Sequence, residues 1–223
     1  MSRPSGHRSF KDELYAEFAR IGQALASPKR LEMLDLLAQR EWPVEELARE
    51  MDQTLANTSQ HLQVLLRARL VEVRRQGTRA YYRLAGGDVY RLWQAIRELG
   101  EVRLAEVPAV VRRHLGERPD VQVLNVTELL RRVRAGDIIL LDVRPVEEYR
   151  AGHLPGARPV PLAELTRTLK TLPKHRDLVV YCRGPYCVLS DEAVALLHRK
   201  GFRARRLALG FPDWQALRHS ATS

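Results

Sequence analysis

The spacing of apolar residues changes along this 223-residue chain, and that change limits the folds available to it. In residues 10–25 apolar side chains recur every three or four positions, the period of one helical face. In residues 138–143 and 178–181 they form unbroken runs, typical of strands buried on both faces of a parallel sheet. The pattern predicts a mainly α N-terminal domain and an α/β C-terminal domain with a parallel sheet.

Length agrees with this division, because 223 residues suit two domains of about 100 to 150 residues, each with its own core. Residues 116–121 are largely polar, contain one Gly and one Pro, and are predicted to be a linker. The expected boundaries are therefore residues 1–115, a linker over 116–121, and residues 122–223.

Composition excludes several classes of protein. No apolar run approaches the roughly 18 residues of a membrane span, and the first nine residues lack the apolar centre of a signal peptide, so we expect a cytoplasmic protein without a membrane partner. The formal net charge of +10 favours a polyanionic partner. Positive charge is concentrated in residues 54–83, which hold six Arg and one acid, Glu72.

Prolines, turn residues and an N-cap residue in the N-terminal half indicate where its helices begin and end. Pro28 suits the first turn of a second helix, and Pro43 opens a short third one. After a turn at Asp52-Gln53, Thr54 is predicted to be the N-cap of a fourth helix that runs to about Arg67. The third and fourth helices are thus joined by a tight turn.

The fourth helix is predicted to have a polar face opposite its buried one. Small and amide side chains on that face can reach base edges in a DNA major groove, although a solvated surface would carry the same types. Inward-facing residues are Thr58, Leu62 and Leu65, and the polar face holds Ala56, Asn57, Ser59, Gln60 and Gln63.

A β-hairpin is expected directly after these helices. Residues 70–84 alternate apolar and charged side chains around Gln76-Gly77, a turn sequence. Its tip is lined by Arg74, Arg75 and Arg79, which can bind phosphates. Following two turn-linked helices, such a hairpin favours nucleic-acid binding over mere charge decoration.

The order of these elements, together with residues 47–51, 59–65 and 77–84, resembles the ArsR-type winged helix-turn-helix regulators. The resemblance implies a homodimer on a palindromic double-stranded operator, with the fourth helix as recognition helix and the hairpin as wing. It also implies that part of the last helical stretch, residues 88–115, forms the dimer seam with the first helix.

One property of that family is not expected here. Many members sense a metal through Cys-x-Cys at the start of the third helix, but residues 41–47 contain no thiol. A second family site uses carboxylates and His on the last helix. His114 and Glu117 are three residues apart, but no upstream Asp-x-His accompanies them. We therefore predict neither a metal site nor a cofactor.

Both cysteines of the chain, Cys182 and Cys187, lie in one short segment. An apolar strand ends before Cys182, a loop with Gly184 and Pro185 follows, and a helical pattern resumes by Leu189. Parallel α/β folds place reactive groups at such strand ends, where a helix N-terminus favours a thiolate. In a reducing compartment, the pair is predicted to be redox-active or catalytic.

The C-terminal half resembles a rhodanese domain over roughly residues 122–218, through residues 141–144, 147–149, 152–157 and 181–184 in that order. The resemblance implies thiosulfate sulfurtransferase chemistry. Cys182 would take the outer sulfur of thiosulfate or of a persulfide donor, become a persulfide, and pass that sulfur to an acceptor thiol. His153, within one of these motifs, is expected only to hydrogen-bond backbone.

The loop residues have expected roles. The cation of Arg183 and the helix N-terminus would favour the thiolate, and Gly184 would allow the tight turn. Backbone N–H groups over residues 183–188, Pro185 excepted, could surround the persulfide's terminal sulfur. Cys187 either attacks the persulfide, which releases sulfide and leaves a disulfide, or is a small apolar residue at the helix start.

Phosphatase or arsenate reductase chemistry is a rival interpretation, since related folds use Cys-x5-Arg to hold an oxyanion. Val188 stands where that Arg would be, so the guanidinium is missing. The favoured hypothesis is a regulator whose DNA binding responds to sulfur on Cys182. A sulfurtransferase that its DNA-binding domain only localises, and a regulator with a silent rhodanese module, are the alternatives.

Overall fold

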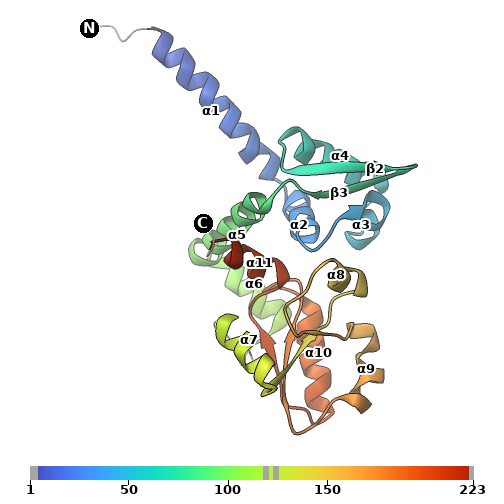
Figure 1. The fold of residues 1–223 in the computed structure, drawn as a ribbon. Helices are drawn as coiled ribbons and strands as arrows, with labels where there is room; N and C mark the ends of the chain where they lie inside the picture. The colour runs from blue at the N-terminus through green and yellow to red at the C-terminus, as the bar shows by residue number, and fades with distance from the viewer. Residues whose placement is uncertain (1–4, 118–120, 123–125, 221–223) are drawn as a thin grey trace. The chain divides into compact units, whose positions relative to one another are not determined.

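The computed structural model describes residues 5–117, 121–122 and 126–220. The chain divides into two compact units, Met1–Trp93 and Gln94–Ser223 (Figure 1). The domain boundaries expected from the sequence, with a linker over residues 116–121, stay a prediction. Part of that expected linker, residues 118–120, lies outside the described residues.

The first unit is helical, with a small antiparallel sheet in the order β1-β3-β2 (Figure 1). This confirms a mainly α winged helix-turn-helix fold. Its elements are α1 (Ser5–Leu25), α2 (Pro28–Leu37), β1 (Trp42–Pro43), α3 (Val44–Glu50), α4 (Leu55–Arg67), β2 (Val71–Gln76), β3 (Arg79–Leu84) and the first part of α5 (Gly87–Arg103).

Helices α3 and α4 form the expected turn-linked pair. The Thr54 hydroxyl accepts a hydrogen bond from the Asn57 N–H at 3.2 Å, which confirms Thr54 as the N-cap of α4. Thr58, Leu62 and Leu65 are fully buried, as predicted. The position of α4 is therefore set by core packing, and its opposite face remains accessible.

The hairpin forms with its two-residue turn one position later than expected, at Gly77-Thr78, because Gln76 pairs with Arg79. Gly77 has φ 59°, a conformation that glycine adopts readily. The predicted terminal stripe over residues 88–115 is not one helix. It forms α5 and α6 (Glu106–Leu115), which are separated at Leu104-Ala105.

The second unit has a five-stranded parallel sheet in the order β4-β8-β7-β5-β6. This confirms an α/β fold of the rhodanese type. Its further elements are β4 (Val121–Gln122), α7 (Val126–Ala135), β5 (Ile138–Asp142), α8 (Val146–Ala151), β6 (Arg158–Pro159), η1 (Leu162–Glu164), α9 (Leu165–Thr168), η2 (Leu169–Thr171), β7 (Asp177–Tyr181), α10 (Val188–Arg199), β8 (Ala204–Leu207) and α11 (Phe211–Ser220).

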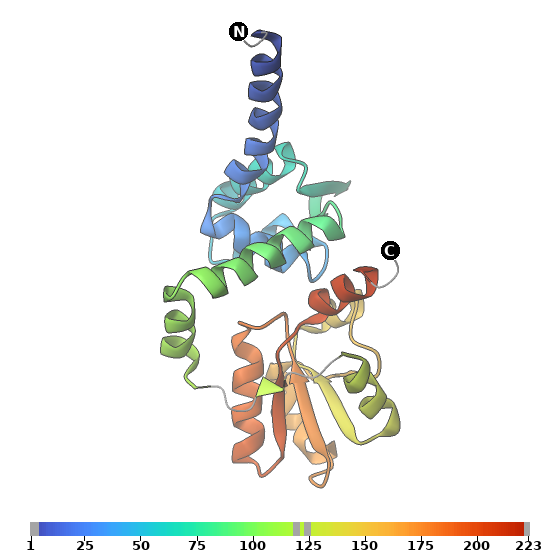
Figure 2. The ribbon, with the colours of Figure 1, turned by 90° about the vertical axis from the view of Figure 1, so that its left-hand side faces the viewer.

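Helices cover both faces of this sheet, with α10 on one side and α7 on the other (Figure 2). Alternate residues of the central strands go to opposite faces: Leu178 and Val180 pack with α10, and Val179 packs with Leu129 of α7. Because both faces are buried, every residue of β5 is apolar except Asp142 at its end. The sheet thus presents the carboxyl ends of β5 and β7 together.

Within the described residues, no helix combines the length and apolarity needed to cross a membrane.

Candidate functional site: a cysteine loop and a candidate DNA-binding surface

The cysteine loop lies between β7 and α10, as predicted. Strand β7 ends at Tyr181, Cys182 follows with only 2% of its surface exposed, and Cys187 is the N-cap residue of α10. The reactive position is therefore at the carboxyl end of a central strand and before the amino end of a 12-residue helix.

The two thiols meet in this loop. Cys182 and Cys187 are joined as a disulfide, with their Cα atoms 6.1 Å apart. The Cys187 N–H donates to the Gly184 carbonyl at 3.2 Å, and the Ser190 hydroxyl donates to the Cys187 carbonyl at 2.9 Å. In this state the Cys187 N–H is used within the loop, so it does not belong to an anion-binding set of N–H groups.

Arg183 is held by a buried carboxylate. Its Nε lies 3.0 Å and its Nη2 2.6 Å from Oε1 of Glu148, whose side chain is fully buried. The sequence interpretation gave Arg183 the role of a cationic neighbour that favours the thiolate. Pairing with Glu148 offsets much of that charge, so Arg183 positions the loop backbone more than it supplies a field.

Two further contacts hold the loop from the β8 side. The Arg206 Nη1 donates to the Pro185 carbonyl at 2.8 Å. Gly210 lies so close to the loop that a Cβ there would be 2.1 Å from the carbonyl oxygen of Arg183. Only glycine permits this approach, which fixes the loop between β7 and the segment after β8.

Beneath the loop, Asp142, Arg144 and Tyr181 form a buried network. The Asp142–Arg144 ion pair is fully buried at 2.7 Å, and the Tyr181 hydroxyl donates to Asp142 and accepts from the Leu154 N–H. Burial, together with the negative charge of Asp142, raises the pKa of Tyr181. Burial, the largest single effect, lowers the pKa of Arg144, but the hydrogen bond to Asp142 and the charges of Asp142, Tyr181 and Glu148 together outweigh it, so the net shift is upward.

His153 takes the structural role that was expected. Its Nδ1 lies 3.0 Å from the Tyr149 carbonyl oxygen, and its ring stacks on Tyr149 with centroids 3.9 Å apart.

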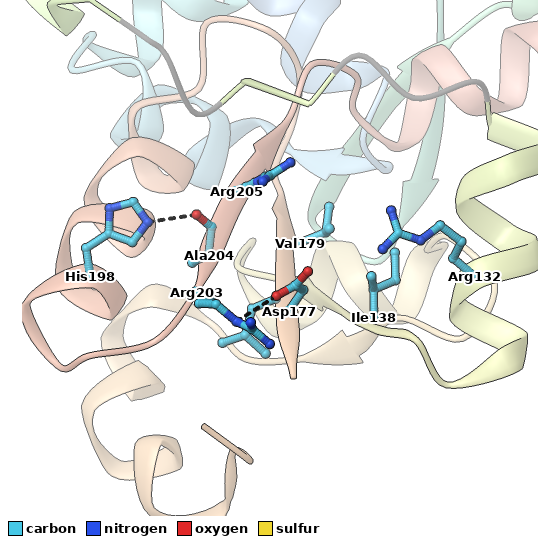
Figure 3. Close-up of a pocket in the computed structure, with 9 residues that line it drawn as sticks. Arg132, Ile138, Asp177, Val179, His198, Arg203, Ala204 and Arg205 are labelled. Carbon is cyan, nitrogen blue, oxygen red and sulfur yellow. Dashed lines mark hydrogen bonds and ion pairs between the residues drawn. The ribbon is translucent and has the colours of Figure 1, made fainter. Parts of the chain in front are cut away.

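A separate cavity of about 340 Å³ opens at the other end of the sheet, beside the first residues of β5, β7 and β8. Figure 3 shows Arg203 paired with Asp177, at 2.9 Å, and His198 bonded to the Ala204 carbonyl at 2.7 Å. The cavity lies at the amino ends of these strands, whereas Cys182 follows the carboxyl end of β7. The sulfur chemistry expected at Cys182 therefore does not involve this cavity.

The candidate DNA-binding surface comprises the exposed side of α4 and the tip of the β2–β3 hairpin. Asn57, Gln60 and Gln63 are exposed on α4, and Ser59 is half-buried. These three amides and one hydroxyl are the side chains expected to contact base edges. Their exposure leaves their polar groups accessible to a duplex.

The three wing arginines differ from one another. Arg75 and Arg79 are exposed near the turn. Arg74 instead bonds Glu41 through Nε at 3.2 Å and Nη2 at 2.6 Å, and lies over the Tyr81 ring at 4.7 Å. The hydrogen bond to Glu41 raises the pKa of Arg74. The guanidinium of Arg74 is thus bound by the carboxylate of Glu41, whereas the side chains of Arg75 and Arg79 are exposed at the hairpin.

Among the described residues, no three or more His, Cys, Asp or Glu side chains are grouped so that they could hold a metal ion.

Sequence reasoning missed several residues that hold the cysteine loop. Glu148 stands in a recognised motif, but nothing local indicated that its partner is Arg183, 35 residues later. Asp213 accepts hydrogen bonds from the Gly210 N–H and from Arg97, and Tyr186 donates to Glu101. Apart from the Gly210–Asp213 bond, these pairs join distant segments, so no spacing pattern could have shown them.

Comparison with known proteins agrees with both halves of this description. A helix-turn-helix domain model matches residues 25–74, and a rhodanese-like domain model matches residues 125–217. The chain is 44% identical to the HTH-type transcriptional regulator Rv0324 of Mycobacterium tuberculosis, over 95% of this chain and 92% of that protein.

Other relatives match one half each. A sulfurtransferase of Allochromatium vinosum is 33% identical over 35% of this chain and 72% of its own length. The homodimeric winged helix-turn-helix DNA-binding domain Mb0332 of Mycobacterium bovis is 42% identical, with a TM-score of 0.42, over 48% of this chain and 95% of that domain. The chain therefore belongs to the ArsR-type winged helix-turn-helix transcriptional regulators that carry a C-terminal rhodanese domain.

Proposed function

We propose that this regulator is a cytoplasmic homodimer that binds operator DNA, and that sulfur on Cys182 changes its affinity for that DNA. The observation that carries the proposal is the placement of both thiols, with Cα atoms 6.1 Å apart, in one loop between a buried strand and a helix. A loop of this kind can hold a thiolate, a persulfide or a disulfide.

The first chemical step is sulfur capture. The Cys182 thiolate attacks the outer sulfur of thiosulfate, the sulfur–sulfur bond of thiosulfate breaks, and sulfite leaves with the electron pair of that bond. Cys182 then carries a persulfide. Gly184 gives the loop its turn, and Arg183, held by Glu148, fixes the backbone after the nucleophile. An acceptor thiol can then remove the outer sulfur.

Cys187 offers a second fate for the persulfide. Its thiolate attacks the inner sulfur, which is Sγ of Cys182, and the bond to the outer sulfur breaks. The outer sulfur leaves as hydrosulfide with that electron pair, and the Cys182–Cys187 disulfide remains. The Cα separation of 6.1 Å is within the range that a disulfide spans.

DNA binding is assigned to the face of α4 and to the wing. Asn57, Ser59, Gln60 and Gln63 would read base edges, and Arg75 and Arg79 would contact phosphates. Arg74 is given a smaller share, because Glu41 already binds its guanidinium.

Dimerisation is assigned to α1. Four of its exposed apolar side chains recur at helical spacing, namely Phe10, Leu14, Phe18 and Ile21. An exposed apolar stripe of this length marks an interaction surface, and in this family a second copy of the chain is the fitting occupant. Apolar residues exposed in the second part of α5, such as Leu99 and Val102, extend the same assignment.

The test pairs intact-mass measurement with DNA binding on the same sample. Thiosulfate should add about 32 Da, one sulfur atom, to the reduced protein but not to Cys182→Ser, and Cys187→Ser should retain that mass because nothing resolves it. Operator affinity should differ between the reduced and sulfurated samples. Equal affinities in both states would refute the coupling.

Two other outcomes identify the alternative functions. Sulfur-transfer turnover without operator specificity would indicate a sulfurtransferase that is only localised by its helix-turn-helix domain. Absence of any mass gain on Cys182 in the Cys187→Ser protein, where nothing can resolve a persulfide, would indicate a rhodanese domain without sulfur chemistry.

A further inference from the structure

Helix α5 belongs to both compact units. It is continuous from Gly87 to Arg103, and the division between the units falls inside it, between Trp93 and Gln94. In the first unit Val89 and Tyr90 are buried, and the Trp93 indole N–H donates to Asp35 of α2 at 3.0 Å. The first half of α5 is thus anchored to the domain that carries α4.

The second half of α5 is anchored within the second unit. Arg97 Nη2 lies 2.7 Å from Oδ1 of Asp213, and the two side chains are only 11% and 7% exposed. The Gln94 amide donates to the same oxygen at 3.1 Å. The other oxygen, Oδ2, accepts the Gly210 N–H at 2.7 Å. Asp213 therefore connects α5 to the backbone at Gly210.

Gly210 in turn contacts the cysteine loop. The space for its Cβ is filled by the Arg183 carbonyl, 2.1 Å away. Gly184 lies close as well, since a Cβ built on it would be 3.8 Å from Arg97 Nη1 and 3.9 Å from Asp213 Oδ2. Gly184, two residues after Cys182, thus lies beside the Arg97–Asp213 ion pair of α5.

A second anchor reaches the same loop from one helical turn further along α5. The Tyr186 hydroxyl donates a hydrogen bond to Oε1 of Glu101. Tyr186 directly precedes Cys187, so the two anchors on α5 hold the loop near each of its thiols. Arg97 and Glu101 are four residues apart and therefore lie on one face of the helix.

A packed loop held in this way changes between discrete arrangements rather than deforming gradually. A sulfur atom added to the buried Cys182, or a bond formed to Cys187, must alter the conformation of the loop that both anchors contact. Because α5 is a single helix, displacement of its second half is carried into its first half, which is fixed to α2. A nearly buried ion pair is an effective link, since separating its partners leaves charges without compensation.

We propose that Arg97 and Glu101 of α5 transmit the sulfur state of Cys182 to the DNA-binding domain. This inference rests on the proposed function, because it concerns how sulfur on Cys182 alters DNA affinity. Both side chains act as positioning residues: they hold the loop through Asp213 and Tyr186, and neither touches the reacting sulfur.

The test measures the ratio of operator dissociation constants for the sulfurated and reduced full-length protein, with thiosulfate as the sulfur source. The wild-type ratio should depart from one by about 5- to 150-fold, the usual range of allosteric coupling, and Arg97→Gln and Glu101→Ala should each bring it toward one. Both variants should retain the mass gain on Cys182 and the operator affinity of the reduced wild type.

Matched controls lie on the same helix. Arg103→Gln removes an exposed arginine and Glu98→Ala an exposed glutamate, so each repeats the charge change at a position away from the loop anchors. Both controls should keep the wild-type ratio. Loss of the ratio in these controls as well would show a nonspecific effect of charge on α5 and would overturn the assignment to Arg97 and Glu101.

The two proposals fail in different ways. A ratio of one in the wild type refutes sulfur-dependent DNA binding itself. A wild-type ratio that persists in both anchor variants refutes only the path through α5. If Arg97→Gln proves unstable because Asp213 loses its ion pair, the exposed Glu101→Ala variant decides the question alone.

Discussion

The candidate DNA-binding surface and the cysteine loop are built on opposite principles. The first takes its side chains from one stretch, residues 57–79, and most of them are exposed. The second places two buried or half-buried cysteines in a loop whose supports, Glu148 and Glu101, come from 35 and 85 residues away. Substitutions on the surface should therefore change binding and leave folding alone, whereas substitutions around the loop should change stability first.

The largest effect should come from Glu148→Gln. This change leaves the Arg183 guanidinium, only 14% exposed, without its carboxylate, and removal of one partner from a buried pair destabilises by about 3–5 kcal/mol. Urea unfolding of the full chain measures the loss. The exposed neighbour Glu147→Gln is the control and should change stability by less than about 0.5 kcal/mol. Similar losses in both variants would contradict the contrast between loop and surface.

Binding, not folding, should change when the amides of α4 are removed. Gln60→Ala and Gln63→Ala should each weaken operator binding by about 1–3 kcal/mol, because a bidentate contact to a base edge is lost. Affinity for a duplex of unrelated sequence should stay near the wild-type value, and so should the urea midpoint. Equal weakening on both duplexes would assign these residues to the DNA backbone instead.

Two arginines of the wing differ in their contacts: Arg74 is bound by Glu41, and Arg75 is exposed near the turn. Arg75→Ala should lower the slope of log affinity against log salt by about 1, as expected for one lost phosphate contact. Arg74→Ala should have a smaller effect, since Glu41 already holds that guanidinium at 2.6 Å. Titrations at several salt concentrations on one duplex measure both slopes. An equal effect at Arg74 would mean that DNA displaces Glu41.

Local patterns were enough to predict the elements that local forces determine. Thr54 as an N-cap, the buried face of α4 and the glycine-centred hairpin all follow from spacing and residue type. The strand, loop and helix around Cys182 were predictable for the same reason. Each of these features spans fewer than about 15 residues, the reach of a periodicity argument.

What the sequence could not indicate is pairing between distant segments. Strands β1, β4 and β6 have two residues each and exist only because a partner strand lies beside them, as Trp42 does beside Tyr82. The break in the expected terminal helix at Leu104-Ala105, by contrast, could have been predicted, because Pro108 has no N–H to donate to the Leu104 carbonyl and falls in the first turn of α6. The interpretation of Arg183 as a cationic neighbour of the thiol did not include its pairing with Glu148, because that approach is decided by the sheet and not by either motif.

The smallest expected effect is a change in how stability depends on pH, and it concerns Tyr181 beneath the cysteine loop. Its pKa is raised by burial and by Asp142, so the native state keeps this proton at a pH where the unfolded chain, with a value near 10.0, releases it. Above that pH the unfolded state binds fewer protons, and stability falls by up to about 1.4 kcal/mol per pH unit. Tyr181→Phe should lack this part of the alkaline decline, whereas Tyr15→Phe, on the exposed face of α1, should decline as the wild type does. Urea midpoints between pH 9 and 11, about one unit on either side of the ordinary tyrosine value, measure the slopes. Identical slopes in all three proteins would show that the Tyr181 hydroxyl ionises without opposition from Asp142, and the network beneath the cysteine loop would lose its electrostatic basis.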